Sequence, residues 1–324
     1  MAMTVDPLSL LRETCELDPS PVVAAFVEEF RRRFKDGLAA VVFYGSRLDS
    51  ETASGNSFFD FYLVCDDYRS VFSRRRDRWS ARVLPPNVYF LEIEHEGEPL
   101  RCKVCVISVE DLRREVHFEA SDLYHLGRFS KRIGLAWYRD TFERDELLGC
   151  CWQAMGTITE HAVNKVPNEF TLDEFITQAL ALSYLGEVRL EKTDEKVAAL
   201  FAAAPEFYRA AYRVHLDQFC DANPELFHAR QAEDPPGTYF MRRSVSQRAA
   251  LHETTRSLLA RSRRRGKMRW FKNILFIDNW LDYLLDKVER TYGVRIELTP
   301  AERRWPLILG WRHYFRLRRE GKIK

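Results

Sequence analysis

Two short features near the N-terminus could act together on phosphate groups. Gly45-Ser46 ends an apolar run at 40–44, and a second apolar run at 58–64 carries a single acid, Asp60. Glycine lets a phosphate approach closely, so the backbone N–H groups and the hydroxyl of this turn could hold phosphate oxygens. A carboxylate inside an apolar strand is costly unless its charge is compensated, and a metal ion would compensate it. The features predict a metal-dependent nucleotidyl-transfer site. An ordinary α/β hairpin with a serine-capped turn stays open as the alternative.

The elements around these residues are expected to form a mixed sheet of about four strands with flanking helices. A helix begins at Pro21, which suits the first helical position, and leads into the first strand. The runs at 40–44 and 58–64 are typical of buried strands, and 88–93 with 100–108 is typical of a hairpin. This sheet would bring the turn and the acid to one place.

The rest of the chain predicts helices. Helical patterns run from Val109 to about residue 228, and the proline-containing stretch 222–237 is typical of a loop or linker. The predicted fold class is therefore α+β, in three parts. These are an N-terminal mixed sheet with flanking helices (1–115), a mainly helical domain (116–235) and a basic helical C-terminal region (236–324).

Composition limits the classes of protein. The chain has 324 residues, of which 46% are hydrophobic, and this is enough for two domains with real cores. No apolar run is long enough for a membrane-spanning helix. The N-terminus has no secretory hydrophobic segment and is too acidic for a mitochondrial transit peptide. We therefore expect a cytoplasmic protein.

Cysteine usage agrees with that compartment. The seven cysteines are an odd number and lie mostly inside apolar runs, which is typical of buried free thiols in a reducing cytoplasm. Cys102-x-x-Cys105 has the spacing of a zinc site, but it lacks a second pair and sits in an expected strand, so zinc stays only as an alternative. No histidine lies near a second His or Cys at ligand spacing.

The C-terminal region has three parts that could meet a membrane. A cationic run occupies 261–269, an apolar helix face with acids opposite lies within 274–288, and aromatic residues alternate with arginines in 305–319. Aromatic and basic residues together suit an interface with anionic lipid. Packing on protein is the favoured alternative for 274–288. For 261–269 a solvated face or RNA binding stays open.

Several separated pieces carry a resemblance to known families. They are Tyr44-Gly45-Ser46, Phe59-Asp60-Phe61, Asp66-Asp67, Trp79-Ser80, Lys103 before Val106-Ile107-Ser108, Glu110-Asp111-Leu112, Leu123-Tyr124-x-x-Gly127-Arg128-x-x-Lys131 and Ala181-Leu182-Ser183-Tyr184-x-Gly186. The strand–turn–strand part resembles the polymerase-beta-type nucleotidyltransferase superfamily. The ordered set resembles the mitochondrial-type phosphatidate cytidylyltransferases, the translocator assembly and maintenance family, which also has bacterial members.

The resemblance implies a reaction and an environment. Residues 1–115 would be a nucleotidyltransferase-like domain that transfers CMP from CTP to phosphatidic acid with Mg²⁺, giving CDP-diacylglycerol and pyrophosphate. The protein would act on an anionic membrane surface, peripheral to the inner face of the cell membrane. No nucleic acid is expected as a partner, and a homodimer is left open.

The resemblance also assigns roles to residues of the turn and the strand. Gly45 and Ser46 would hold the β- and γ-phosphates, and Asp60 would bind Mg²⁺. Phe58 replaces the first of two acids usual in the superfamily, which looks normal for this family. Arg47 departs from the family's Gly-Ser-Gly turn, so it could alter the approach of the phosphates or contact them. Asp66 is a candidate second metal ligand, but it lies about 20 Å along a continuous strand, so a helix cap is the rival role.

Further roles fall on the next strand and helix. Lys103 could neutralise triphosphate charge or orient the lipid phosphate, with a surface lysine on an edge strand as the alternative. Arg128 and Lys131 are spaced to share a helix face and form an anion clamp, unless that face is simply solvated. Tyr124 could pack on the cytosine or on the core. The rival functions are nucleotidyl transfer to another acceptor (protein, RNA or a small alcohol) and a catalytically decayed nucleotide-binding protein.

Overall fold

The protein is analysed as a computed structural model. It describes residues 6–48, 58–185, 193–231, 237–276, Leu281, Leu285, 288–289 and 292–321. Contacts divide the chain into two compact units, Met1–Arg269 and Trp270–Lys324, which are described one at a time. The predicted apolar face within 274–288 lies largely outside the described residues.

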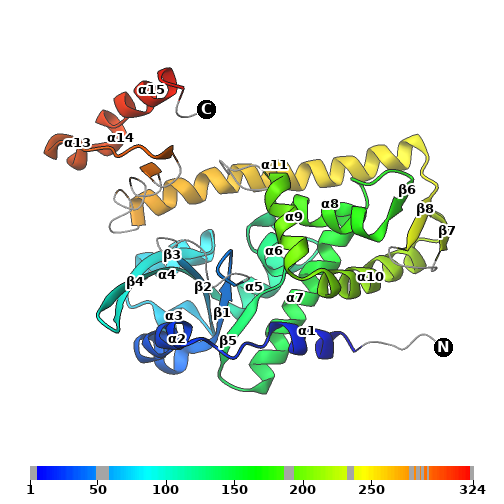
Figure 1. Cartoon of the computed structure of the whole chain (residues 1–324), viewed down its shortest axis with the longest axis horizontal. Helices are drawn as coiled ribbons and strands as arrows, with labels where there is room; N and C mark the ends of the chain where they lie inside the picture. The colour runs from blue at the N-terminus through cyan, green and yellow to red at the C-terminus, as the bar shows by residue number, and fades with distance from the viewer. Residues whose placement is uncertain are drawn as a thin grey trace. The chain divides into compact units, whose positions relative to one another are not determined.

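The centre of the first unit is a mixed five-stranded sheet, which confirms the α+β class (Figure 1). Its order is β3-β4-β2-β1-β5, with β2 and β4 parallel and the other neighbours antiparallel. The strands are β1 (Leu38–Tyr44), β2 (Phe59–Cys65), β3 (Asn87–His95), β4 (Glu98–Ser108) and β5 (Gly134–Tyr138).

The register of the sheet brings the predicted site residues together. Tyr44 at the end of β1 lies opposite Asp60 of β2, and Asp60 lies opposite Lys103 of β4. Because β4 has a neighbour on each side, Lys103 is not on an edge strand, and the alternative of an edge-strand surface lysine is wrong.

The two faces of β2 meet different helices. Phe61 packs between Phe26 and Phe30 of α2 (Pro21–Phe34), with ring centroids 5.3 and 5.2 Å apart. Its neighbour Tyr62 packs on Phe129 of α6 (Leu123–Phe129) at 5.2 Å. Side chains alternate along a strand, so Asp60 shares the face that looks toward α6.

Helices make up most of the rest of the first unit. Before β3 the chain also forms α1 (Pro7–Cys15), the short η1 (Lys35–Gly37), α3 (Tyr68–Val71) and α4 (Arg75–Val83). After β4 it forms α5 (Val109–Val116), α7 (Thr141–Ala162), α8 (Leu172–Leu185), α9 (Thr193–Ala203), α10 (Pro205–Ala222) and α11 (Val245–Phe276). The part of α11 from Trp270 on belongs to the second unit.

The region 116–235, which was predicted to be mainly helical, also contains strands. It contributes β5 to the main sheet, paired with β1, so the sheet crosses the predicted boundary at 115/116. It also forms most of a small sheet of order β6-β8-β7, built from β6 (Glu169–Thr171), β8 (Thr238–Met241) and β7 (Phe227–Gln231). The five-residue apolar run of β5 gives little signal because it lies among long helical patterns.

All seven cysteines are buried and free, as predicted. Cys102 belongs to the core on the α2 side of the sheet, whereas Cys105 lies 3.5 Å from the Tyr44 hydroxyl. Three residues along a strand place two side chains on opposite faces, so this pair cannot hold one zinc ion.

The second unit contains α13 (Pro300–Arg304), α14 (Pro306–Leu309) and α15 (Trp311–Arg319). Thr299 caps α13 in a reciprocal capping box with the buried Glu302, which also lies 2.8 Å from the His313 ring. Large aromatic side chains stay exposed on this unit: Trp305, Trp311 and Phe315 are each more than half exposed. Among the residues that the structure describes, no helix combines the length and apolar character needed to cross a bilayer.

Candidate functional site

The turn after β1 lies against the Asp60 carboxylate. Gly45 has φ +93°, a conformation that side chains other than glycine rarely adopt. A Cβ added there would lie 3.0 Å from Asp60 Oδ2. Glycine is therefore required at position 45 for two reasons: it adopts this backbone angle readily, and it leaves room for the backbone to approach the Asp60 carboxylate. Ser46 follows it as an exposed residue of the turn, which Leu48 N closes by donating to Gly45 O.

Lys103 compensates the charge of Asp60. Its Nζ lies 3.2 Å from Asp60 Oδ1, and the two side chains are only 22% and 30% exposed. Burial lowers the pKa of the Lys103 ammonium, but Asp60, together with Cys105 and Tyr124, outweighs burial and holds that pKa well above its ordinary value. The lysine therefore stays charged beside the acid.

Helix α6 adds an aromatic and a cationic side chain beside Asp60 and Lys103. The Arg128 guanidinium lies 3.8 Å from the centre of the Tyr124 ring and 6.0 Å from that of Tyr44, and Arg128 Nη1 donates to Tyr124 O at 2.6 Å. Cys105 Sγ lies between the two tyrosine hydroxyls, at 3.5 and 3.7 Å. Through these contacts Arg128 and Tyr124 join the sheet face that carries Asp60.

Arg47 turns from the loop onto the strand. Its guanidinium lies 4.2 Å from the centre of the Phe59 ring, and Phe59 packs on Phe26 of α2, so this contact is on the face of the sheet opposite to Asp60. Burial lowers the pKa of the Arg47 guanidinium. Arginine in such a position keeps its charge and several donors. Six predicted residues gather at one end of β1 and β2 and are called the Asp60 site below: Gly45, Ser46, Asp60, Lys103, Tyr124 and Arg128. Arg47 lies at the same end but on the other face of the sheet.

Asp66 does not belong to the Asp60 site, which corrects the prediction. It follows the opposite end of β2, where both of its oxygens accept from Arg139 at 2.8 Å. Arg139 also pairs with Glu143 of α7. Nor does Asp66 cap the next helix: that role falls to Asp67, whose Oδ1 accepts from Arg69 N at 2.6 Å.

Lys131 does not share a helix face with Arg128. Helix α6 ends at Phe129 with Ser130 as its C-cap, so Lys131 lies beyond it. Its Nζ is 4.1 Å from the centre of the Tyr184 ring of α8. The predicted two-residue clamp is therefore reduced to Arg128 on α6, with Lys131 held toward α8.

One arginine near the site was not predicted. Arg269 of α11 is 4% exposed, its guanidinium lies 4.4 Å from the centre of the Tyr124 ring, and its Nη2 donates to Asp122 Oδ2 at 2.6 Å. The cationic run 261–269 was interpreted only as a solvated, membrane or RNA surface. Arg261, Arg265 and Arg269 are spaced by four residues and so share one helix face, but this spacing does not indicate that Arg269 is buried.

The Asp60 site can hold a magnesium ion only together with phosphate oxygens. Within the described parts of the chain, no three His, Cys, Asp or Glu side chains gather to bind a metal. Mg²⁺ is commonly held by one or two carboxylates, with substrate phosphates and water completing its six oxygen ligands. One carboxylate beside an open backbone turn and two cationic side chains fits that pattern. No family model matches this chain, and a search of the curated proteins finds no relative.

Proposed function

We propose that the protein is a nucleotidyltransferase, and that it transfers CMP from CTP to phosphatidic acid to give CDP-diacylglycerol and pyrophosphate. The observation that carries the proposal is the approach of the Gly45 backbone to the Asp60 carboxylate, with Lys103 Nζ 3.2 Å from that acid. This arrangement offers N–H donors, one hard-metal ligand and cationic side chains at one place. The choice of CTP and of a lipid acceptor rests on the family resemblance of the ordered motifs.

The residues of the Asp60 site divide the work of a nucleotidyl transfer. Gly45 and Ser46 would hold the β- and γ-phosphates through backbone N–H groups and a hydroxyl, and Arg47 would contact them after leaving the Phe59 ring. Asp60 would hold Mg²⁺, which supplies charge neutralisation on the triphosphate. Tyr124 would stack on the cytosine, and Arg128 would bind a phosphate oxygen.

Lys103 would exchange partners during the reaction. In the free protein it neutralises Asp60; once the carboxylate holds a cation, the ammonium is released to the phosphates. The lipid phosphate oxygen attacks the α-phosphorus of CTP, the bond from that phosphorus to the bridging oxygen breaks, and pyrophosphate leaves. Lys103 and Arg128 stabilise the negative charge that develops on the leaving group. Positioning and charge neutralisation supply the acceleration.

The second unit would bring the protein to its acceptor. Exposed Trp311 and Phe315 lie in sequence among the arginines of α15, and exposed Trp305 follows Arg303 and Arg304 of α13. This combination suits the headgroup region of an anionic membrane. The proposed place of action is the inner face of the cell membrane, with the protein bound peripherally.

A second candidate is a nucleotide-binding protein that has lost catalysis. It is favoured by the single carboxylate of the Asp60 site, because two acids are usual in the superfamily that the strand–turn–strand part resembles. Calorimetry with CTP and Mg²⁺ separates the two: binding without turnover supports the second candidate, whereas lipid-soluble product supports the first.

The deciding experiment incubates the protein with radiolabelled CTP, Mg²⁺ and phosphatidic acid in detergent micelles, with ATP and GTP in parallel. We expect label in the organic phase from CTP alone. Asp60→Asn should lower the rate at least about a hundredfold, because it removes the metal ligand. Asp66→Asn is the matched control: it removes a carboxylate at the other end of the same strand and should leave the rate within about twofold. Full Mg²⁺-dependent activity of Asp60→Asn would contradict the site assignment.

A further inference from the structure

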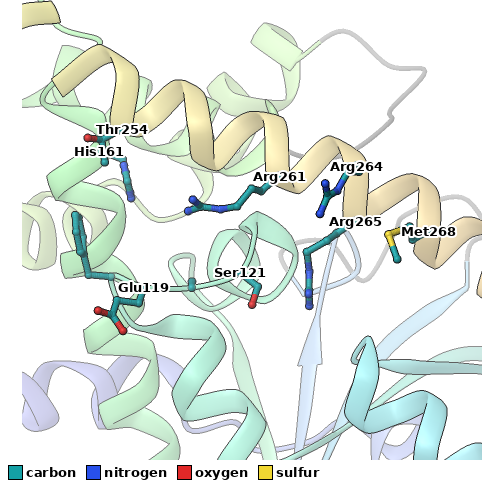
Figure 2. Close-up of a pocket in the computed structure, with 10 residues that line it drawn as sticks. Glu119, Ser121, His161, Thr254, Arg261, Arg264, Arg265 and Met268 are labelled. Atoms are coloured by element: carbon teal, nitrogen blue, oxygen red, sulfur yellow. The ribbon is translucent and has the colours of Figure 1, made fainter. Parts of the chain in front are cut away.

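A pocket that the proposed function does not use lies between α11, the end of α7 and the segment that joins α5 to α6. Its volume is about 610 Å³. One side of the pocket is lined by Phe118, Glu119, Ala120 and Ser121, and another by His161 and Thr254. The third side is lined by Arg261, Arg264, Arg265 and Met268 of α11 (Figure 2). None of these residues belongs to the Asp60 site.

The charge of this pocket is dominated by arginine. Arg265 is already compensated, because its Nε donates to Asp122 and its Nη2 lies 3.4 Å from Glu115. Arg261 and Arg264 are exposed, and within the described part of the chain neither forms an ion pair. Glu119 offsets one of these two charges. The pocket therefore keeps an excess of positive charge facing a cavity.

A buried histidine in the pocket wall lacks a partner on one side. His161 is 3% exposed; its Nδ1 lies 3.3 Å from Thr255 Oγ1, while its Nε2 has no hydrogen-bond partner among the described residues. Phe118 stacks on the ring at 5.4 Å and 8°. Most buried ring nitrogens are hydrogen-bonded, so this one points to a missing acceptor or donor.

The arginine and the histidine converge. Figure 2 shows the Arg261 side chain extending from α11 toward His161 on α7, with Ser121 and Arg265 on the far side of the same opening. Nε2 is covered, so a ligand reaches it only after a side-chain movement, and the exposed Arg261 is able to move. An anion between Arg261 and Arg264 would draw both guanidinium groups inward and would accept from His161 Nε2 when that nitrogen carries a proton.

We propose that this pocket binds a phosphate group, as inorganic phosphate, pyrophosphate, a soluble phosphate monoester or the phosphate of a lipid headgroup. Arg261 and Arg264 supply charge-assisted hydrogen bonds, His161 supplies a buried donor, and the Ser121 hydroxyl lines the opening. Guanidinium groups match phosphate oxygens in geometry, and the apolar Phe118 and Met268 leave room for an organic substituent. This site does not depend on the proposed function.

The test follows the side-chain nitrogen signals of the histidines by NMR in the full-length chain, at constant ionic strength set with chloride. His161→Gln identifies the His161 signal by its loss. Inorganic phosphate should shift that signal saturably, while chloride should not. Pyrophosphate, glycerol phosphate, and vesicles with and without phosphatidic acid then show which source of phosphate binds most tightly.

Matched variants locate the effect. Arg261→Gln with Arg264→Gln should weaken phosphate binding roughly tenfold or more, the loss expected for a charge-assisted hydrogen bond. Both residues are exposed, so folding should persist. Arg263→Gln removes an exposed arginine from the same run that does not line the pocket, and it should leave the affinity unchanged. Asp60→Asn should also leave it unchanged.

Three results would overturn the proposal. They are a His161 signal that none of the phosphate compounds moves, an equal loss of affinity in Arg263→Gln, and a shift abolished by Asp60→Asn. The last result would mean that phosphate binds at the Asp60 site instead.

Discussion

At the scale of single residues, adding one methyl group at Gly45 tests whether its backbone belongs to the nucleotide site. Gly45→Ala forces a side chain into a backbone with φ +93° and brings its Cβ to 3.0 Å from Asp60 Oδ2. We expect a loss of about 1 to 2 kcal/mol in the free energy of unfolding from backbone strain. We also expect Mg²⁺–CTP binding to weaken at least about tenfold, as measured by calorimetry.

Gly97 provides the control, because it has a similar backbone without a neighbour. Its φ is +82°, and nothing lies within 4 Å of an added Cβ. Gly97→Ala should therefore cost a similar free energy of unfolding but leave nucleotide binding unchanged. Equal losses of binding in both variants would assign the effect to general strain and remove Gly45 from the site.

The residues of the site differ in how far the sequence alone could place them. Gly45 and Asp60 lie in one short strand–turn–strand pattern, and the register of two paired strands was enough to bring them together. The prediction of Asp66 as a metal ligand is wrong because its partner, Arg139, is far away in sequence and no local pattern indicates that partner. The prediction that Lys131 shares a helix face with Arg128 is wrong because it requires a helix through residue 131, whereas α6 ends at Phe129.

At the scale of elements, Asp122 joins α6 to α11. Its Oδ1 caps α6 by accepting from Tyr124 N at 2.8 Å, and its Oδ2 accepts from Arg265 at 2.5 Å and Arg269 at 2.6 Å. The carboxyl is fully buried. Burial raises the pKa of the Asp122 carboxyl, but Arg269, the Tyr124 backbone N–H and Arg265 together outweigh burial and hold that pKa below its ordinary value. The contact between α6 and α11 thus depends on the negative charge of Asp122.

Asp122→Asn should therefore destabilise the protein by about 3 to 5 kcal/mol, because Arg269 would keep a buried charge without a counter-ion. Urea unfolding measures the difference. Asp140→Asn is the control: Asp140 caps α7 by accepting from Glu143 N at 3.0 Å, is exposed, and forms no ion pair with an arginine among the described residues. Since asparagine also caps helices well, that variant should lose less than about 1 kcal/mol. Similar losses in the free energy of unfolding of the two variants would show that Asp122 acts only as an ordinary helix cap.

The elements that sequence reasoning missed have a common cause. Strand β5 is recognised only by its pairing with β1, and the burial of Arg269 only by its contact with Asp122, 147 residues away. Both depend on partners distant in the chain, whereas helix starts and buried strands leave local patterns. The α+β class and the first four strands could be predicted for that reason.

At the scale of the whole molecule, buried histidines predict sensitivity to acid. Burial lowers the pKa of His161 and of His215 to about 4, and that of His125 falls well below its ordinary value. In the unfolded chain each histidine takes up a proton near pH 6.5, whereas in the fold it stays neutral. The stability that these groups contribute is present above pH 6.5 and is lost as the pH falls toward 4.

For His161 and His215 this loss is on the order of 2 kcal/mol each at pH 5. Urea unfolding at pH 7 and pH 5 in phosphate-free buffer should show it. His161→Gln with His215→Gln should be less stable at pH 7, but its stability should fall less between the two pH values, and the carboxylates common to both proteins cancel in the comparison. Adding phosphate at pH 5 should restore part of the wild-type loss, because an anion beside His161 favours its charged form. An identical pH dependence in wild type and double variant would show that these histidines are not neutral in the fold.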